Sequence, residues 1–95
     1  MPAYVIADIE ITDAAAFEEY RQRVPATIAQ YGGRYVVRGG PLETLEGDWR
    51  PRRLVVLEFP SMAQARAWYD SEEYREPRAI RQRCSRGHAI LVEGA

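Results

Sequence analysis

Residues 39–51, with the sequence GGPLETLEGDWRP, connect two apolar runs whose composition is typical of β-strands. The glycines of this segment allow positive φ, its prolines fix φ, and the pair Gly47-Asp48 favours a turn. Trp49 adds a large apolar side chain beside that turn. We therefore predict an ordered, bent hairpin connection whose tryptophan is substantially buried, either against its own domain or against a partner.

The runs on either side of this connection are predicted strands, residues 34–38 and 53–59. Residues 3–11 alternate as a strand does, and residues 87–93 form the last predicted strand. The strands 53–59 and 87–93 are apolar at successive positions, which is typical of strands that are covered on both faces.

Helices are predicted between these strands. In residues 13–31 apolar side chains recur every three or four positions, and Pro25 is expected to kink or divide this helix. A capping-box pattern begins a second helix, residues 61–70. Residues 71–74 are predicted to form an irregular turn, and a short helix, residues 77–84, follows with its proline in the first turn.

This order is β-α-β-β-α-β, the ferredoxin-like pattern of the α+β class, and it predicts a four-stranded antiparallel sheet in one domain, residues 1–95. The two main helices can cover only one face of such a sheet. The other face also needs a cover, because two strands are apolar on both faces. A second copy is the simplest cover, so we predict a homodimer that forms through the sheet face.

Composition excludes several classes of partner and compartment. The net charge of −1 gives no reason to expect nucleic acid or a membrane surface as a partner. No apolar run approaches the roughly 20 residues that span a bilayer, and no signal-peptide pattern is visible. The single cysteine, Cys84, excludes an internal disulfide and is expected to pack as a small apolar residue. Together these features predict a cytoplasmic protein.

The residue types that are missing exclude much cofactor chemistry. All 13 residues counted as lysine or arginine are arginine, which excludes a Schiff-base lysine and a lysine-containing phosphate loop. His88 and Cys84 cannot build a histidine-cysteine zinc site alone, and no glycine-rich dinucleotide fingerprint is present. We expect no cofactor and no metal. A carboxylate-only metal site and haem bound through His88 stay open as alternatives.

Four short motifs resemble one known family. They are YVVRGG (35–40), LEGDW (45–49), VLEFPS (56–61) and YDSEEY (69–74). Together they resemble the family of domain of unknown function 1330, over nearly the whole chain. The resemblance implies a dimeric α/β barrel, in which two ferredoxin-like subunits pack sheet against sheet. The wider superfamily includes cofactor-independent monooxygenases, haem-degrading enzymes and lactone isomerases. The family has no established reaction, so the resemblance assigns no catalytic residue.

Strand alternation places three charged side chains on the sheet face opposite the helices. Asp8, Arg38 and Glu58 are expected there among apolar neighbours, and a buried charge without a partner is costly. One interpretation is a pocket in which Arg38 binds a small ligand through a carboxylate, enolate or carbonyl group. The other is a structural ion pair between Arg38 and Glu58 that fixes strand register or the dimer.

Four further side chains are candidates for the same pocket. Trp49 would form its wall and Asp48 would act as acid or base, although such a tryptophan also anchors loops or dimers. His88 begins the last predicted strand and is a candidate general base, with a structural or exposed role as the alternative. Tyr69 has the spacing of a core residue, with a hydroxyl that could reach a site.

Two functions from different classes fit these residues. The first is a small cofactor-independent enzyme, monooxygenase-like or isomerase-like, that acts on an oxygenated or aromatic metabolite. The second is a dimeric module that binds a small ligand or a partner without catalysis, which would explain why no nucleophile-base pair is visible.

An arginine-rich stretch is interpreted as a solvated face rather than an RNA site: Arg75, Arg78, Arg81, Arg83 and Arg86.

Overall fold

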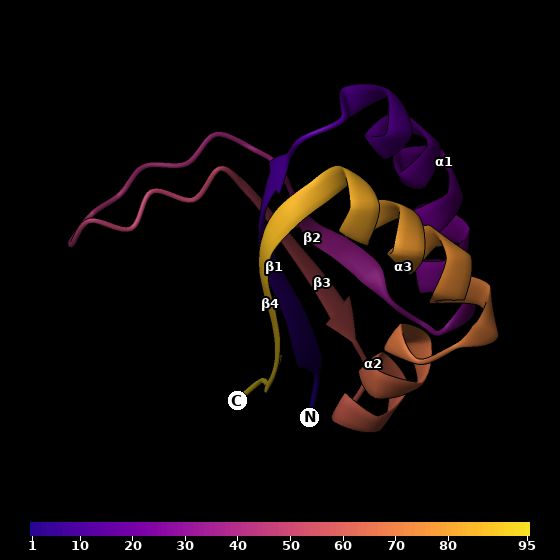
Figure 1. The fold of residues 1–95 in the computed structure, drawn as a ribbon. Coiled ribbons are helices and arrows are strands. Elements are labelled where there is room, and N and C mark those ends of the chain that lie inside the picture. Colours follow the sequence, from indigo (N-terminus) through magenta and orange to yellow (C-terminus); the bar gives the residue numbers. More distant parts are fainter.

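The computed structural model describes residues 1–95, and its secondary structure confirms the predicted α+β pattern (Figure 1). The elements are β1 (Ala3–Ile11), α1 (Ala14–Gln30), β2 (Arg34–Arg38), β3 (Arg53–Phe59), α2 (Met62–Tyr69), α3 (Glu72–Cys84) and β4 (Ser85–Glu93). The four strands form one sheet in the order β2-β3-β1-β4, and all neighbouring strands are antiparallel. This is the ferredoxin-like arrangement.

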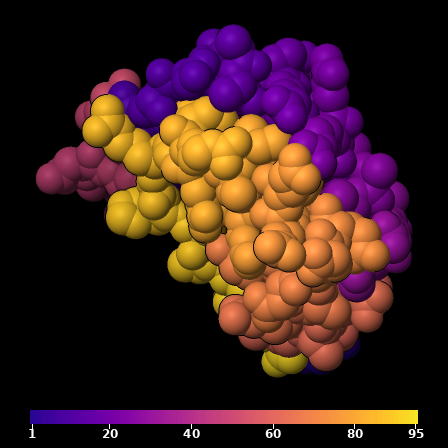
Figure 2. Space-filling model, turned by 45° about the vertical axis from the view of Figure 1, so that its right-hand side comes forward, coloured from indigo at the N-terminus to yellow at the C-terminus, as the bar shows by residue number.

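The three helices all lie on one side of the sheet, as Figure 1 shows. Helices α1 and α3 pack against each other, and the space-filling view shows their side chains closing over this side of the molecule (Figure 2). The opposite side of the sheet, which we call the open face, has no cover from the chain itself. None of the helices is long and apolar enough to cross a membrane.

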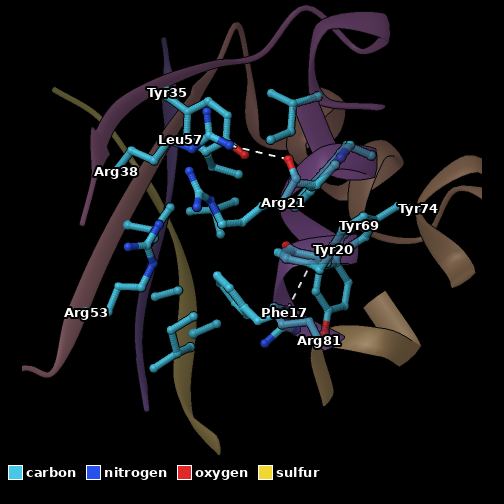
Figure 3. Close-up of a pocket in the computed structure, with 18 residues that line it drawn as sticks. Phe17, Tyr20, Arg21, Tyr35, Arg38, Arg53, Leu57, Tyr69, Tyr74 and Arg81 are labelled. Carbon is cyan, nitrogen blue, oxygen red and sulfur yellow. Dashed lines mark hydrogen bonds between the residues drawn. The ribbon is translucent and has the colours of Figure 1, made fainter. Parts of the chain in front are cut away.

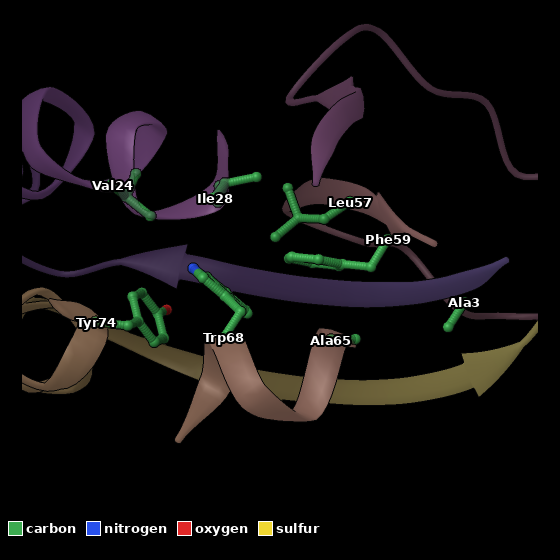
Figure 4. Packing of buried hydrophobic residues seen from close by; sticks show 8 residues of the cluster. All are labelled: Ala3, Val24, Ile28, Leu57, Phe59, Ala65, Trp68 and Tyr74. Atoms are coloured by element: carbon green, nitrogen blue, oxygen red, sulfur yellow. The ribbon is translucent and has the colours of Figure 1, made fainter. Parts of the chain in front are cut away.

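The core between helices and sheet has two parts. The larger cluster gathers around Trp68, whose ring stacks on Tyr74 with 4.1 Å between ring centroids (Figure 4). The indole nitrogen of Trp68 donates a hydrogen bond to Thr27 Oγ1 at 3.0 Å, so this buried ring has no unpaired polar atom. A smaller cluster lies toward the other end of the sheet and contains Ile9, Phe17, Ile80 and Cys84. The buried Cys84 thiol packs there as predicted.

One helix prediction needs correction, and another is narrowed. Helix α1 runs through Pro25 undivided, which excludes a divided helix and leaves a kink as the predicted effect of this proline. Helix α3 begins at Glu72, five residues before the predicted start, and Pro77 lies inside it. Ser71, expected in an irregular turn, is the N-cap of α3, and its hydroxyl accepts a hydrogen bond from the Tyr74 amide at 3.1 Å.

The segment between β2 and β3 is an extended arm, residues 39–52. It projects away from the helices, beyond the open face (Figure 1), and its two sides form no ladder of backbone hydrogen bonds. The side chains of Leu45 and Trp49 are 88% and 62% exposed, so the prediction that Trp49 is buried against its own domain is wrong. A partner is the remaining predicted cover for this side chain.

A β-bulge interrupts β2. Tyr35 pairs with Leu57, and Val37 pairs with Val56, so Val36 is an extra residue on this strand. The extra residue reverses the alternation from this point on. Arg38, which pairs with Val55, therefore lies on the helix side of the sheet rather than on the open face.

Candidate functional site

A cavity lies between the sheet and the helices, where the two core clusters meet. It holds about 50 Å³ of space for water-sized molecules, enough for a few waters or a small functional group. Fourteen of its 18 lining residues are hydrophobic, and none carries a carboxylate, an imidazole or a thiol. The lining residues with hydroxyl or guanidinium groups are Tyr20, Arg21, Tyr35, Arg38, Arg53, Tyr69, Tyr74 and Arg81.

On the helix side, three polar groups form a chain of hydrogen bonds. Nε of Arg81 donates to the hydroxyl of Tyr74 at 3.3 Å, and the hydroxyls of Tyr74 and Tyr20 lie 2.9 Å apart. Arg81 favours the arrangement in which Tyr74 donates to Tyr20, because a cation beside a hydroxyl oxygen makes its proton a stronger donor. The Tyr20 proton is then free to point into the cavity.

On the strand side, two guanidinium groups lie against aromatic rings (Figure 3). Cζ of Arg38 is 4.3 Å from the ring centroid of Tyr35, and Cζ of Arg53 is 5.5 Å from that of Phe17. The backbone makes room for Arg53 at Gly39, which has a φ of +70°, because a Cβ at this position would collide with the guanidinium. Nε of Arg53 is buried and has no hydrogen-bond partner.

Pro25 explains how Arg38 is held. A proline has no amide proton, so the carbonyl four residues earlier, that of Arg21, lacks its helical partner. Nη2 of Arg38 donates to this carbonyl at 3.5 Å, at the long end of the hydrogen-bond range. The missing helical hydrogen bond thus leaves an acceptor on α1 that binds Arg38 of β2 beside the cavity.

Burial and neighbouring groups shift the pKa values of two residues that line the cavity, Arg53 and Tyr20. Burial lowers the pKa of Arg53, and repulsion from Arg21 and Arg38 lowers it further. Burial also raises the pKa of Tyr20 far above its ordinary value, with a further increase from Tyr74. Tyr20 is therefore a neutral hydrogen-bond donor at physiological pH rather than a base.

The predicted grouping of Arg38 with Glu58 is wrong, because the bulge separates them. Glu58 lies on the open face, where Arg34 Nε donates to it at 2.7 Å and the Tyr4 hydroxyl donates to it at 3.0 Å. Arg34 is directly opposite Glu58 in the register of β2 and β3. A structural ion pair does exist on the open face, with Arg34 in the place predicted for Arg38.

The other predicted residues also divide between the two sides of the sheet. Asp8 is on the open face, where it accepts hydrogen bonds from Trp49 Nε1 at 2.9 Å and from the Arg52 amide at 3.0 Å. His88 is exposed opposite Asp8 on β4, and Asp48 is exposed at the end of the arm. Tyr69 lines the cavity together with Arg38.

The sequence analysis did not place three of the arginines that line the cavity. For two of them, the spacing of residues in the sequence indicates the position. Arg53 is two positions before Val55 on one strand, so alternation places both side chains on the same face. Arg21 follows Phe17 by four positions on the apolar stripe of α1. Arg81 was expected on a solvated face, and only its contact with Tyr74 identifies its position.

Comparison with known families identifies one match. The model of a family described as Domain of unknown function (DUF1330) matches residues 2–95. No curated protein matches the chain.

Comparison with solved structures supports the fold. A protein of unknown function from Rhodopseudomonas palustris superposes with a TM-score of 0.80 at 20% identity, over 99% of this chain and 82% of that one. SnoaB, a cofactor-independent oxygenase from Streptomyces nogalater, superposes with a TM-score of 0.66 at 14% identity, over 99% of this chain and 93% of its own. At these identities the likeness extends to the fold alone.

Proposed function

The chain belongs to the DUF1330 family, and we propose that it is a cofactor-independent enzyme that acts on a small oxygenated or aromatic molecule in the cavity between sheet and helices. The observation that carries this proposal is the chemistry of the cavity lining. Every charged group in it is a cation, and its neutral polar side chains are tyrosine hydroxyls. Such a lining favours a ligand that carries or develops negative charge on oxygen.

The three hydrogen-bonded side chains of Arg81, Tyr74 and Tyr20 would stabilise that negative charge. When a proton leaves the carbon beside a carbonyl, or leaves a phenol, negative charge grows on the oxygen. A donor already fixed in an apolar cavity stabilises this oxygen more than water does, because the donor does not have to reorient. Oxygenation and isomerisation both proceed through such an enolate or phenolate.

The lack of a base in the lining narrows the substrate class. No carboxylate, imidazole or thiol lines the cavity to remove the proton. The suitable substrates are therefore those acidic enough to give their proton to water, such as phenols and enolised ketones. The fold shared with SnoaB supports oxygenation, in which the substrate anion itself reduces dioxygen.

Dioxygen uptake tests this proposal. The purified protein is incubated with hydroxylated naphthalenes and related phenols in the presence of a chelator, and dioxygen consumption is recorded. We expect turnover that falls by about 10–100-fold in Tyr20→Phe. Tyr31→Phe is the matched control, because its hydroxyl binds Glu73 outside the cavity. Tight binding of these compounds without turnover would indicate a binding module instead, and equal rates in Tyr20→Phe would remove the proposed donor.

We also propose that the protein is a homodimer whose subunits meet at their open faces. Three exposed apolar side chains of this face, those of Val36, Ile90 and Val92, are 47%, 60% and 42% exposed. The charged groups beside them are paired already, as Arg34 is with Glu58. Covering the face would therefore bury apolar surface without leaving an unpaired carboxylate there.

The arm supports a second copy as the cover. It projects on the side of the open face (Figure 1), and it is anchored there through Asp8, which binds Trp49 and Arg52. Each side of the arm is about seven residues long, or roughly 20 Å when extended, whereas packed sheets lie about 10 Å apart. The arm is thus long enough to pass the seam and place Leu45 on the partner subunit.

The compartment we propose is the cytoplasm. The observation that supports it is the buried free thiol of Cys84, since a reducing compartment keeps such a thiol unmodified.

A further inference from the structure

We propose that Arg38 and Arg53 bind the carboxylate of the ligand, so that the substrate is a small aromatic acid. This inference rests on the proposed function in one respect, namely that the cavity binds a ligand. It goes further because it names the chemical group of the ligand that binds at the strand end of the cavity. The substrate would be held at this end and would react at the helix end.

The register of the sheet brings the two guanidinium groups together. Arg38 pairs with Val55, and Arg53 is two residues before Val55, so both side chains leave the same face of adjacent strands as diagonal neighbours. Diagonal neighbours are about 7–8 Å apart at Cα, a gap that long side chains bridge. The two cations lie close enough for repulsion from Arg38 to contribute to the lowered pKa of Arg53.

Neither cation has an acidic partner. The ion pairs of the protein include Arg21 with Glu18 at 3.2 Å, but none involves Arg38 or Arg53. Two neighbouring cations beside an apolar cavity are costly without an anion. The buried, unpaired Nε of Arg53 is a donor for such an anion.

The geometry favours a planar anion attached to a flat body. Guanidinium groups bind carboxylates through two parallel hydrogen bonds, in the plane that both groups share. The rings of Tyr35 and Phe17 lie beside the guanidinium groups of Arg38 and Arg53, respectively. Beyond them the lining contains Arg21 and is otherwise apolar and aromatic as far as Tyr20 on the helix side (Figure 3). This lining matches an aromatic ring with its acid group on the strand side, once side chains move to make room for it.

The ligand must displace side chains to enter, because the cavity holds only about 50 Å³. Arg38 is exposed, and its guanidinium is held by the Tyr35 ring and by one long hydrogen bond to Arg21. Movement of this side chain opens the cavity and would re-form its hydrogen bonds with the carboxylate. Arg38 would thus act both as gate and as ligand contact.

Calorimetric titration with benzoate and with benzamide tests this inference. The two probes have nearly the same shape and differ in charge. We expect benzoate to bind at least about tenfold more tightly than benzamide. We also expect Arg53→Met and Arg38→Met each to weaken benzoate binding by about tenfold or more, with little effect on benzamide. Arg75→Met is the matched control, because Arg75 is exposed on α3 and pairs only with Glu72.

Several outcomes would overturn the inference. One is equal affinity for benzoate and benzamide, and another is benzoate binding that both arginine variants leave unchanged. Sulfate that competes at the same concentration as benzoate would indicate an adventitious ion site without preference for a planar acid. If an arginine variant does not fold, the comparison of the two probes on the native protein, by the shift in melting temperature, still decides.

The result is independent of whether the protein is an enzyme. Benzoate binding that depends on Arg53, together with no dioxygen uptake by any phenol, would leave the acid site standing and remove the proposed reaction. Turnover of phenols, together with benzoate binding that Arg53→Met leaves unchanged, would remove the acid site and leave the proposed reaction standing.

Discussion

At the scale of single residues, Pro25 weakens its own helix and leaves a hydrogen-bond acceptor free for another element. It removes one backbone hydrogen bond from α1, and the carbonyl of Arg21 that it leaves free accepts a hydrogen bond from Arg38. A local defect in one element thus becomes a contact between two elements. It also positions one of the two cations that we assign to ligand binding.

Pro25→Ala is therefore expected to separate stability from binding. Alanine restores the amide that bonds to Arg21, so the free energy of unfolding should rise by about 1–3 kcal/mol. Arg38 then competes for its acceptor, and benzoate affinity should fall several-fold. Urea unfolding and calorimetry measure the two effects. Pro77→Ala, inside α3 and away from the cavity, is the control that should leave affinity unchanged.

Tyr20 gives the stability of the protein a pH dependence. Its pKa is raised above the ordinary value of 10.0 by burial and by Tyr74, so the folded state favours the neutral form. This contribution to stability is fully present below about pH 10, and it is lost as the pH rises through 10 toward the raised pKa. In Tyr20→Phe the free energy of unfolding should fall less between pH 8 and 12. Identical pH profiles of parent and variant, measured by urea unfolding, would contradict this.

At the scale of elements, the backbone conformation at the end of β2 makes room for a side chain of the cavity. Gly39 has positive φ, and its missing side chain leaves the space that Arg53 occupies. Gly39→Ala should cost about 1–2 kcal/mol for the backbone conformation, with an additional cost for the displaced guanidinium. Gly47 has a φ of +79° and open space within 4 Å of the position that a Cβ would take, so Gly47→Ala isolates the backbone cost. A loss of stability and of benzoate affinity no larger in Gly39→Ala than in Gly47→Ala would contradict the close fit of Arg53.

The sequence predicts most of the elements but not this junction. Residues 3–11 alternate and residues 53–59 form an apolar run, so the bounds of β1 and β3 follow from the residues alone. Val36 and Val37 are both β-branched and apolar, so nothing in their composition indicates which is the extra residue, and the face of Arg38 was predicted wrongly. The start of α3 was missed because Pro77 suggested a first turn, although Ser71 followed by two acidic residues has the pattern of an N-cap.

At the scale of the whole molecule, the dimer that we propose depends on the open face. Val56 lies at its centre, opposite Ile6 on β1 and Val37 on β2. Val56→Asp should place a charge in the covered interface and yield monomers at micromolar concentration in sedimentation velocity. Ala67→Asp, on the exposed side of α2, introduces the same charge away from the face and should remain dimeric. A parent protein that sediments as a folded monomer would refute the dimer.

The arm gives an optical signal for the same assembly. Trp68→Phe leaves Trp49 as the sole tryptophan of the two, and Trp49 is 62% exposed in a single chain. Its fluorescence should be blue-shifted in the dimer and should move to longer wavelength on dilution, because the partner subunit would cover the ring. Emission typical of water at a concentration where the dimer is intact would exclude the arm from the interface.

The extra residue at Val36 has a consequence for how this protein can evolve. Loss of that single codon would turn Arg38 from the cavity to the open face, so one mutational event would alter the ligand chemistry and the proposed subunit interface together. Point substitutions can change the two properties one at a time, whereas a change in the length of β2 cannot. Descendants of this chain are therefore expected to vary the identity of Arg38 more readily than the number of residues that precede it.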